Sequence, residues 1–283
     1  MAAFTVCLTH DVDRVYKSYQ YLTRDLRHGE WGRLKTLWNR ESPFWRFEHL
    51  MELEDRYGAR STFYFLQESI PFEPLRPANW KLSLGRYSYE DPKIQKAIRR
   101  LAAGGWEIGV HGSYNSFRDA ELLRREKESL EEVLGESVCG IRQHYLNLDI
   151  PRTWLLQKAA GFKYDASLGR RRDIGFPDGR DRPFRDPVSG QVIIPLALMD
   201  GYLFRRASQD LEKAWSMTLN LIDEAERSDA VLTALWHPHV CNDAEYPGWG
   251  TLYERLIKEC HARAARFLTA REVYEEYVSH SSS

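Results

Sequence analysis

Short apolar segments rich in β-branched and aromatic residues alternate with amphipathic segments along most of this chain, and this alternation constrains the fold more than any other feature. The apolar segments predict strands at residues 4–9, 61–66, 106–110, 138–141, 192–196 and 231–235. The amphipathic segments predict helices at about 43–57, 91–103, 117–134, 151–160, 211–226 and 253–265. Strands that alternate with helices indicate the α/β class, built on a parallel sheet or a (β/α) barrel.

The length of 283 residues allows one large α/β domain or two smaller ones. We expect a single domain over residues 1–283. Three segments interrupt the alternation and are expected to be loop and helix insertions, at roughly 14–57, 68–90 and 169–190.

Charge and cysteine content exclude several classes of protein. The formal net charge of −1 gives no overall basic field, so a nucleic-acid partner is not expected. The four cysteines form no CxxC pair, which argues against a structural zinc knot. The N-terminus does not look like a secretion signal, and no apolar stretch reaches the roughly 18 residues of a spanning helix. These features predict a cytoplasmic protein without a membrane span.

Reactive side chains follow the predicted strands. They are Asp11, Asp13, His111, Arg142, Asp165 and His237. In a (β/α) barrel the carboxyl ends of the strands face one shared pocket. Scattered surface residues would not fall so regularly at strand ends, so we interpret this set as a candidate active site.

The two acids after the first strand favour a metal. Asp11 and Asp13 are two residues apart and leave the strand on the same side. Two such carboxylates repel each other unless a cation or a shared proton offsets their charge. His111 with Asp13 would begin a mixed nitrogen and oxygen site, and Asn115 is a further ligand if residues 111–115 form a helical turn. The alternatives are solvated turn acids and a structural histidine.

Two more side chains suit acid–base chemistry. His237 and His239 follow the last strand, and one of them can act as a general acid because histidine titrates near neutral pH. Arg142 beside an acid would orient it and keep it ionised. Structural roles for the histidines and a surface position for Arg142 are the alternatives.

These segments, in their order, resemble the motifs of the polysaccharide deacetylases of carbohydrate esterase family 4. The similar segments are Leu8-Thr9-His10-Asp11-Val12-Asp13, Ser61-Thr62-Phe63-Tyr64, Gly104 to His111, Arg142-Gln143-His144-Tyr145, Gly161-Phe162-Lys163-Tyr164-Asp165 and Leu235-Trp236-His237-Pro238. The resemblance covers roughly residues 4–240 and implies a single-domain distorted (β/α) barrel of the polysaccharide deacetylase type.

The resemblance also implies roles for particular residues. Asp11 would be the general base, oriented by Arg142, and the backbone N–H of Tyr145 would help to bind the oxyanion. His237 would be the general acid, tuned by Asp165. Asp13 and His111 would bind a divalent metal, most often zinc, with cobalt or nickel as alternatives.

Two departures from the family pattern concern the metal. The second metal histidine of the family falls at Asn115, and an amide oxygen is a weaker zinc ligand than imidazole. The proline of the arginine motif is His144 here, which offers a replacement ligand. His10 and His239 are the other candidates.

The function implied is a metal-dependent hydrolase that removes an acetyl or formyl group from an amino sugar or a glycan precursor. The expected substrate is nucleotide-linked or lipid-linked, in intracellular synthesis of surface polysaccharide. Arg170-Arg171-Arg172 would meet a phosphate, or simply form a solvated loop. The alternatives are an amidohydrolase acting on a small non-sugar amide and, because of Asn115, a metal-free glycan-binding pseudoenzyme.

Overall fold

One curled sheet forms the centre of the molecule. The computed structural model describes residues 4–26, 29–33 and 42–281. The strands are β1 (Thr5–Val12), β2 (Thr62–Leu66), β3 (Glu107–Gly112), β4 (Gly140–Gln143), β5 (Tyr164–Asp165), β6 (Phe184–Arg185), β7 (Val192–Ile193), β8 (Leu198–Met199), β9 (Val231–Leu235) and β10 (Arg266–Phe267). Their order is β6-β7-β5-β4-β3-β2-β1-β9-β8, with β10 beside β1. The pairings are parallel except that of β6 with β7.

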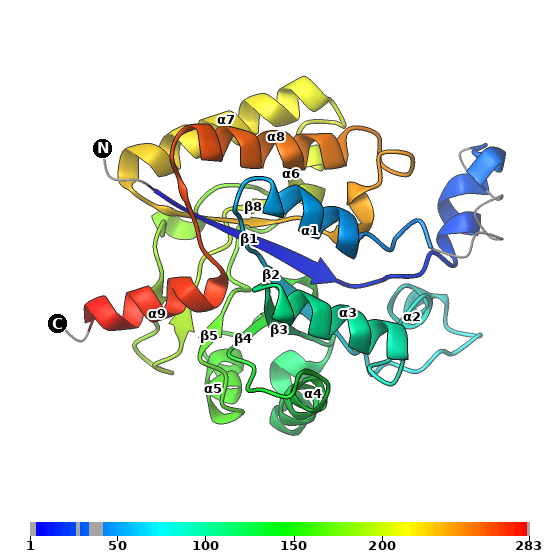
Figure 1. Ribbon diagram of the computed structural model, residues 1–283. Helices are drawn as coiled ribbons and strands as arrows, with labels where there is room; N and C mark the ends of the chain where they lie inside the picture. The colour runs from blue at the N-terminus through cyan, green and yellow to red at the C-terminus, as the bar shows by residue number, and fades with distance from the viewer. Residues whose placement is uncertain (1–3, 27–28, 34–41, 282–283) are drawn as a thin grey trace.

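Helices surround this sheet, most of them on its outer face (Figure 1). They are α1 (Phe47–Asp55), α2 (Pro77–Ser83), α3 (Pro92–Ala103), α4 (Ala120–Leu134), α5 (Arg152–Ala159), α6 (Asp200–Arg206), α7 (Leu211–Ser228), α8 (Trp249–Ala262) and α9 (Ala270–Ser281). Local sequence sets several ends. Asp91, Asp119 and Asp210 accept a backbone N–H at the starts of α3, α4 and α7, and Gly135 ends α4 in the left-handed conformation. The expected α/β class and distorted (β/α) barrel are confirmed.

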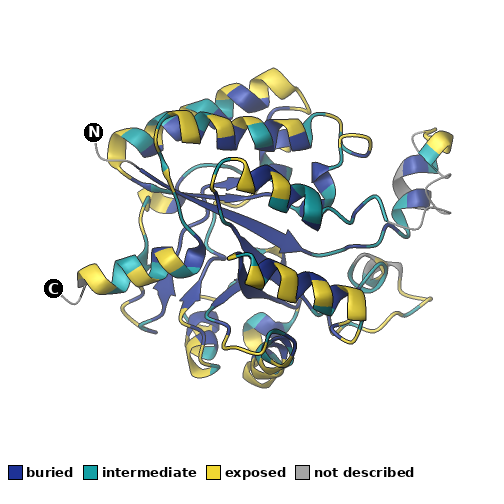
Figure 2. Cartoon of the chain, in the orientation of Figure 1, coloured by how far each residue is buried: buried dark blue, intermediate teal, exposed yellow. Residues whose placement is uncertain are grey.

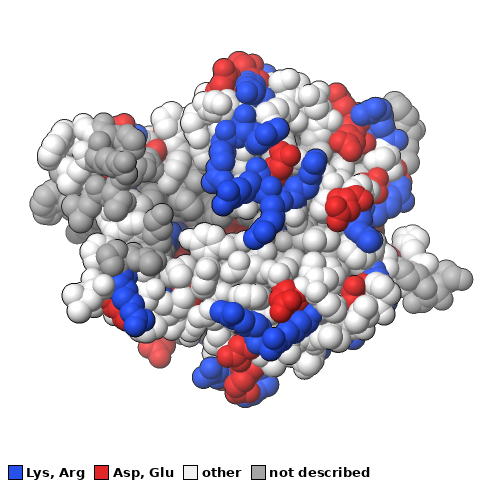
Figure 3. Space-filling view, turned by 180° about the vertical axis from the view of Figure 1, so that it is seen from behind, with Lys and Arg blue, Asp and Glu red and all other residues white. Residues whose placement is uncertain are grey.

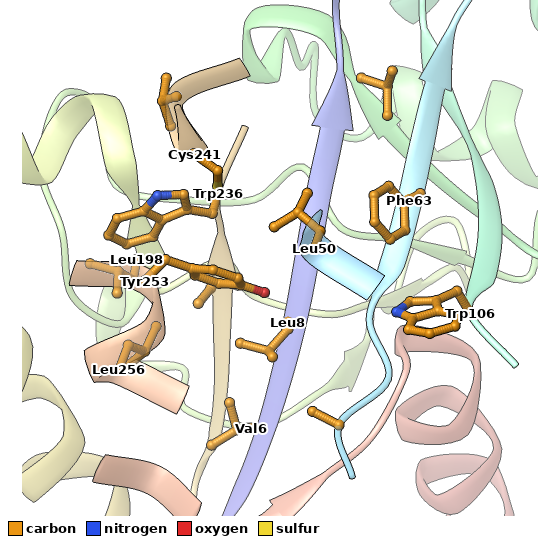
Figure 4. Close-up of a cluster of buried hydrophobic side chains, with 14 of the residues drawn as sticks. Val6, Leu8, Leu50, Phe63, Trp106, Leu198, Trp236, Cys241, Tyr253 and Leu256 are labelled. Carbon is orange, nitrogen blue, oxygen red and sulfur yellow. The ribbon is translucent and has the colours of Figure 1, made fainter. Parts of the chain in front are cut away.

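The main core lies between the sheet and the helices, where the strands and the inner helix faces are buried (Figure 2). Figure 4 shows Leu8 of β1 near Leu50 of α1 and Tyr253 of α8. A second, smaller cluster on the inner side of the sheet includes Tyr64 and Tyr164. The sheet is therefore packed on both faces, as a parallel sheet requires.

The side-chain alternation along β1 separates these two clusters. Val6 and Leu8 belong to the main core, whereas Cys7 belongs to the inner cluster. His10 follows the outward set: its Nε2 lies 2.8 Å from Oε1 of Glu54 on α1. The proposal of His10 as a metal ligand is therefore wrong, because the strand directs it to the face opposite Asp11.

Part of the first expected insertion packs into the main core. Phe47, Leu50 and Leu53 of α1 are buried in the main core, so this helix is part of the barrel layer. The expected loop at 169–190 contains β6, which extends the sheet. Among the helices of the described part of the chain, none combines the length and the apolar composition needed to cross a bilayer.

Candidate metal centre and active site

The carboxyl ends of β1, β3, β4 and β9 bring the candidate residues together. Asp11 lies near the end of β1 and Asp13 just beyond it, while His111 lies in β3. His144 opens the turn after β4, and His237 follows β9. Because these strands are parallel and follow one another in the sheet, with only β2 between β3 and β1, their carboxyl ends meet at one edge of the sheet.

Asp13 lies at the centre of the site, close to three histidines. Its Oδ1 lies 3.1 Å from Nε2 of His111 and 3.8 Å from Nε2 of His144. Its Oδ2 lies 3.6 Å from Nε2 of His237. Burial alone raises the pKa of Asp13, but the surrounding imidazoles outweigh burial and bring this pKa well below its ordinary value. Asp13 is therefore a carboxylate over the whole physiological pH range.

The hydrogen bonds on the far side of two imidazoles decide which atoms face Asp13. Nδ1 of His111 lies 2.8 Å from the carbonyl oxygen of Arg142, and Nδ1 of His144 lies 3.2 Å from Oε2 of Glu68. A carbonyl or a carboxylate oxygen can only accept, so Nδ1 carries the proton in each neutral ring. Each Nε2 then presents a lone pair toward Asp13.

This donor set fits a divalent cation. Ligand atoms of Asp13, His111 and His144 lie within 4.8 Å of one another. The Oδ1 atom of Asp13 is buried and makes no hydrogen bond to the described residues. A carboxylate oxygen and two imidazole lone pairs directed at one point repel one another, and a metal ion or protons must offset this repulsion. Two imidazoles and one carboxylate are common zinc ligands.

Asp11 is held by a buried arginine. Nη1 of Arg142 donates to Oδ1 of Asp11 at 3.0 Å and to Oγ1 of Thr9 at 2.7 Å, while Nε donates to the carbonyl oxygen of Ala166. The Arg142 side chain is completely buried. These bonds fix the Asp11 carboxylate with its Oδ2 3.7 Å from Nε2 of His111, beside the metal cluster.

Asp200, rather than Asp165, contacts His237. Nδ1 of His237 lies 2.9 Å from Oδ1 of Asp200. The Asp165 carboxylate instead accepts hydrogen bonds from Trp154, Gln157 and Ser167 on the side of α5. The expectation that Asp165 tunes His237 is therefore wrong, because Asp200 takes that place and the Asp165 carboxylate binds these other residues.

The Asp200 carboxylate strongly affects His237. Burial alone lowers the pKa of His237, but the charge and hydrogen bond of Asp200 outweigh burial and raise this pKa to about 10. For the neighbouring His239, burial together with the charge of His237 lowers the pKa to about 3. His239 lies against Phe44 and Tyr246 and is not part of the Asp13 cluster found among the described residues.

Asn115 lies in a turn that is not helical. β3 continues through Gly112, and a 3₁₀ helix begins only at Ser116. The condition for a shared helical face with His111 is therefore not met. The amide oxygen of Asn115 accepts a hydrogen bond from Arg118 at 3.4 Å.

Tyr145 lies beside the proposed metal ligand His144, whereas the arginine loop makes contacts of its own. Tyr145 has a left-handed backbone with φ of 57°, and its ring packs on His144 with centroids 4.5 Å apart. Arg170, Arg171 and Arg172 are exposed, and Arg170 is near Asp173. Figure 3 shows Lys and Arg gathered on the face opposite that of Figure 1. Phosphate binding by these arginines stays a prediction.

Two functional candidates escaped the sequence reasoning. Asp200 comes directly after the two-residue strand β8, and Glu68 comes two residues after β2. An acid just past a strand was the signal that identified Asp11 and Asp13. At Asp200 the strand is too short to give a periodic signal, and Glu68 lies at the start of the expected insertion at 68–90.

Structural comparison places this geometry in a known fold. No protein-family model matches the sequence, and no curated protein is significantly similar to it. A protein assigned as a polysaccharide deacetylase in Mycobacterium smegmatis is similar in structure with a TM-score of 0.66 and 18% identity, covering 99% of this chain and 92% of the other. One similarly assigned in Pseudomonas aeruginosa PAO1 has a TM-score of 0.62 and 14% identity, covering 96% and 90%.

A third similar structure is described as a pseudoenzyme. It is a carbohydrate esterase family 4 protein from Bacillus anthracis, with a TM-score of 0.50 and 9% identity over 96% of this chain and 66% of that one. The chain therefore has the fold of the polysaccharide deacetylases.

Proposed function

We propose that this protein is a metal-dependent hydrolase that removes an N-acyl group from an amino sugar. The observation that carries the proposal is the convergence of Asp13, His111 and His144 beside two tuned pairs, Asp11 with Arg142 and His237 with Asp200. The fold likeness to polysaccharide deacetylases supports the same chemistry.

The proposed metal ligands are the carboxylate of Asp13 and the Nε2 atoms of His111 and His144. When bound, a divalent cation in such a site polarises an acyl carbonyl and lowers the pKa of water. Zinc is the proposed metal, because imidazole and carboxylate are its ordinary ligands, and cobalt or nickel would substitute for it.

Asp11 is the proposed general base. Arg142 and the neighbouring Thr9 hold its carboxylate in one orientation, with one oxygen directed to the side of the metal cluster. The carboxylate takes one proton from the attacking water, whose oxygen forms the new bond to the acyl carbon. Arg142 remains protonated and bound to Asp11 during this proton transfer.

His237 is the proposed general acid. A pKa of about 10 means that its imidazole carries a proton at neutral pH, as an acid must before the reaction. It gives this proton to the amide nitrogen as the C–N bond breaks, so the products are an amine and a carboxylic acid, which keeps the second proton of the water and then ionises in solution. The backbone N–H of Tyr145 donates to the oxyanion, and the left-handed turn at Tyr145 supports this role.

The proposed substrate is an N-acetylated or N-formylated sugar that is nucleotide-linked, lipid-linked or part of a glycan precursor. The experiment is incubation of the zinc- or cobalt-loaded protein with N-acetylated oligosaccharides and nucleotide-linked N-acyl sugars. Released carboxylate and new amine are measured. The control is Asp11→Asn, which should bind the same sugars without turnover. Failure to release carboxylate with every metal and sugar would contradict the proposal.

A glycan-binding protein without catalysis is the second candidate. Asn115, at the position of a metal histidine of the family, favours it, and one neighbour of similar fold is described as a pseudoenzyme. Sugar binding without metal and without turnover would identify this function. Turnover of small non-sugar amides, but not of sugars, would instead indicate an amidohydrolase.

A further inference from the structure

The turn after β4 places His144 beside His111. Tyr145 and Leu146 both have left-handed backbones, with φ of 57° and 54°. This sharp turn leaves the His144 ring 5.2 Å from the His111 ring, measured between centroids. His144 is largely buried, so its position depends on the groups packed around it.

Glu68 is the group that fixes His144. Its side chain is completely buried, and its Oε2 lies 3.2 Å from Nδ1 of His144. The same carboxylate accepts backbone N–H groups from Ser69 at 2.9 Å, Ile70 at 3.3 Å and Tyr114 at 3.2 Å. These donors satisfy the buried carboxylate and hold it in one orientation.

The segment that carries Glu68 is held together by Arg86, which belongs to the same segment, and is tied to the barrel by Tyr87. Arg86 donates to the carbonyl oxygens of Glu68, at 2.7 Å, and of Ile70. The hydroxyl of Tyr87 accepts the N–H of Leu66 and donates to the carbonyl oxygen of Val12, each at 2.6 Å. Val12 precedes Asp13, so the same segment connects the end of β1, next to Asp13, with Glu68, which contacts His144.

The turn around Asn115 is used differently. Its Tyr114 N–H binds Glu68, and the Asn115 amide oxygen bonds to Arg118. The turn that contains position 115, where the family has its second histidine, therefore helps to hold Glu68, and Glu68 in turn holds His144. Glu68 contacts both the 113–115 turn and His144, which come from different strand ends.

We propose that this chain has moved its third metal ligand from position 115 to His144, and that Glu68 is the positioning residue that makes the move possible. Glu68 keeps the proton of His144 on Nδ1, so that Nε2 is directed at Asp13. The ligand class is a divalent cation. The inference rests on the proposed metal site, but it concerns which residues build that site.

The experiment measures metal affinity rather than turnover. Cobalt is titrated into the metal-free full-length protein and followed by its visible absorption, and zinc affinity is measured by competition. Glu68→Gln keeps the shape of the side chain but removes its charge, and should weaken binding by on the order of 10- to 100-fold. His144→Ala should weaken binding more than Glu68→Gln and change the cobalt spectrum.

Two matched controls separate the proposed ligands from general effects. Asn115→Ala should leave the affinity within about twofold of the unmodified protein, because the Asn115 amide oxygen bonds to Arg118. His280→Ala removes an exposed imidazole on α9 and should have no effect. Circular dichroism and thermal unfolding of each metal-free variant show whether it is folded; a variant that is unfolded is replaced by His144→Gln or Glu68→Asp.

The outcomes distinguish this inference from the proposed function. If the unmodified protein binds no divalent metal, the proposed metal-dependent function fails. If it binds metal but His144→Ala binds it equally well, His144 is not the third ligand. The same holds if Asn115→Ala lowers the metal affinity tenfold or more. In either case the proposed function is unaffected. If His144→Ala loses affinity but Glu68→Gln does not, the positioning role of Glu68 is wrong.

Discussion

The Asp200 carboxylate makes two contacts with His237: its Oδ1 lies 2.9 Å from the ring Nδ1, and its Oδ2 accepts the backbone N–H at 2.7 Å. The ring and the backbone of His237 are thus held by one side chain from the start of α6. This pairing leaves Nε2 directed toward Asp13 and sets both the orientation and the charge of the proposed acid.

Asp200→Asn should shift the alkaline limb of the pH–rate profile to lower pH. Burial lowers the pKa of His237 and the Asp200 carboxylate raises it to about 10, so activity should be lost in the unmodified protein only as the pH rises through about 10. Without the Asp200 carboxylate, less negative charge opposes the effect of burial, so the acid loses its proton at lower pH. The measurement is kcat/KM against pH.

Asp165→Asn is the matched control for that experiment. Asp165 is also buried beside a strand end, but its partners are Trp154, Gln157 and Ser167. The substitution should leave the alkaline limb in place even if it lowers stability. An alkaline limb that moves with Asp165 and not with Asp200 would contradict the pairing.

Metal affinity should fall as the pH falls. Burial lowers the pKa of His111, but the carboxylates of Asp11 and Asp13 outweigh it and raise this pKa above its ordinary value. Below that pKa the metal-free site holds a proton on His111 that the metal must displace, so the apparent affinity should fall about tenfold per pH unit. Asp13, whose pKa is low, adds no slope in this range. Cobalt titrations between about pH 6 and pH 8 test this, and an affinity independent of pH contradicts it.

Arg142→Met should strongly destabilise the fold. Arg142 is completely buried and binds Asp11, Thr9 and the carbonyl of Ala166. Its loss leaves the buried Asp11 charge unpaired, which costs about 3–5 kcal/mol of unfolding free energy. Urea denaturation measures the change. The control is Arg124→Met, which removes a half-exposed arginine paired with two glutamates along α4 and should leave the denaturation midpoint unchanged. Equal destabilisation by both substitutions would contradict the stabilising role of Arg142.

Gly140→Ala should disturb the inner cluster of the barrel. A Cβ on Gly140 would overlap the ring of Tyr164, whose hydroxyl donates to the buried Glu107 at 2.8 Å. Forcing this ring to move should cost about 1–3 kcal/mol, seen as a lower Tm. Gly32→Ala is the control, because a methyl group there would meet no atom of the described residues within 4 Å. An unchanged Tm for Gly140→Ala would mean that the ring can relax freely.

Local sequence patterns were sufficient to locate most strands and helices. The alternation predicted β1, β2, β3 and β9 within a few residues, because each contains a continuous run of apolar and β-branched side chains that is buried on both faces. The two-residue strands β8 and β10 were not predicted, since two residues carry no periodic signal.

The partners of the site residues depend on long-range contacts. Sequence reasoning placed Asp13 and His111 in a metal site by spacing and by resemblance, and the structure brings them to 3.1 Å. It could not choose between Asn115 and His144, because the contact of His144 with Glu68 joins residues that are 76 positions apart. It assigned Asp165 to His237 by resemblance, whereas Asp200 occupies that place.

The sequence by itself therefore determined the class of fold, the edge of the sheet that carries the chemistry and the types of side chain gathered there. Strand propensity and turn residues act between near neighbours, so they can be read along the chain. Only the tertiary structure decided which carboxylate meets which imidazole. Such pairs form between residues far apart in sequence, and packing of separate strand ends sets the distances on which their hydrogen bonds and charges depend.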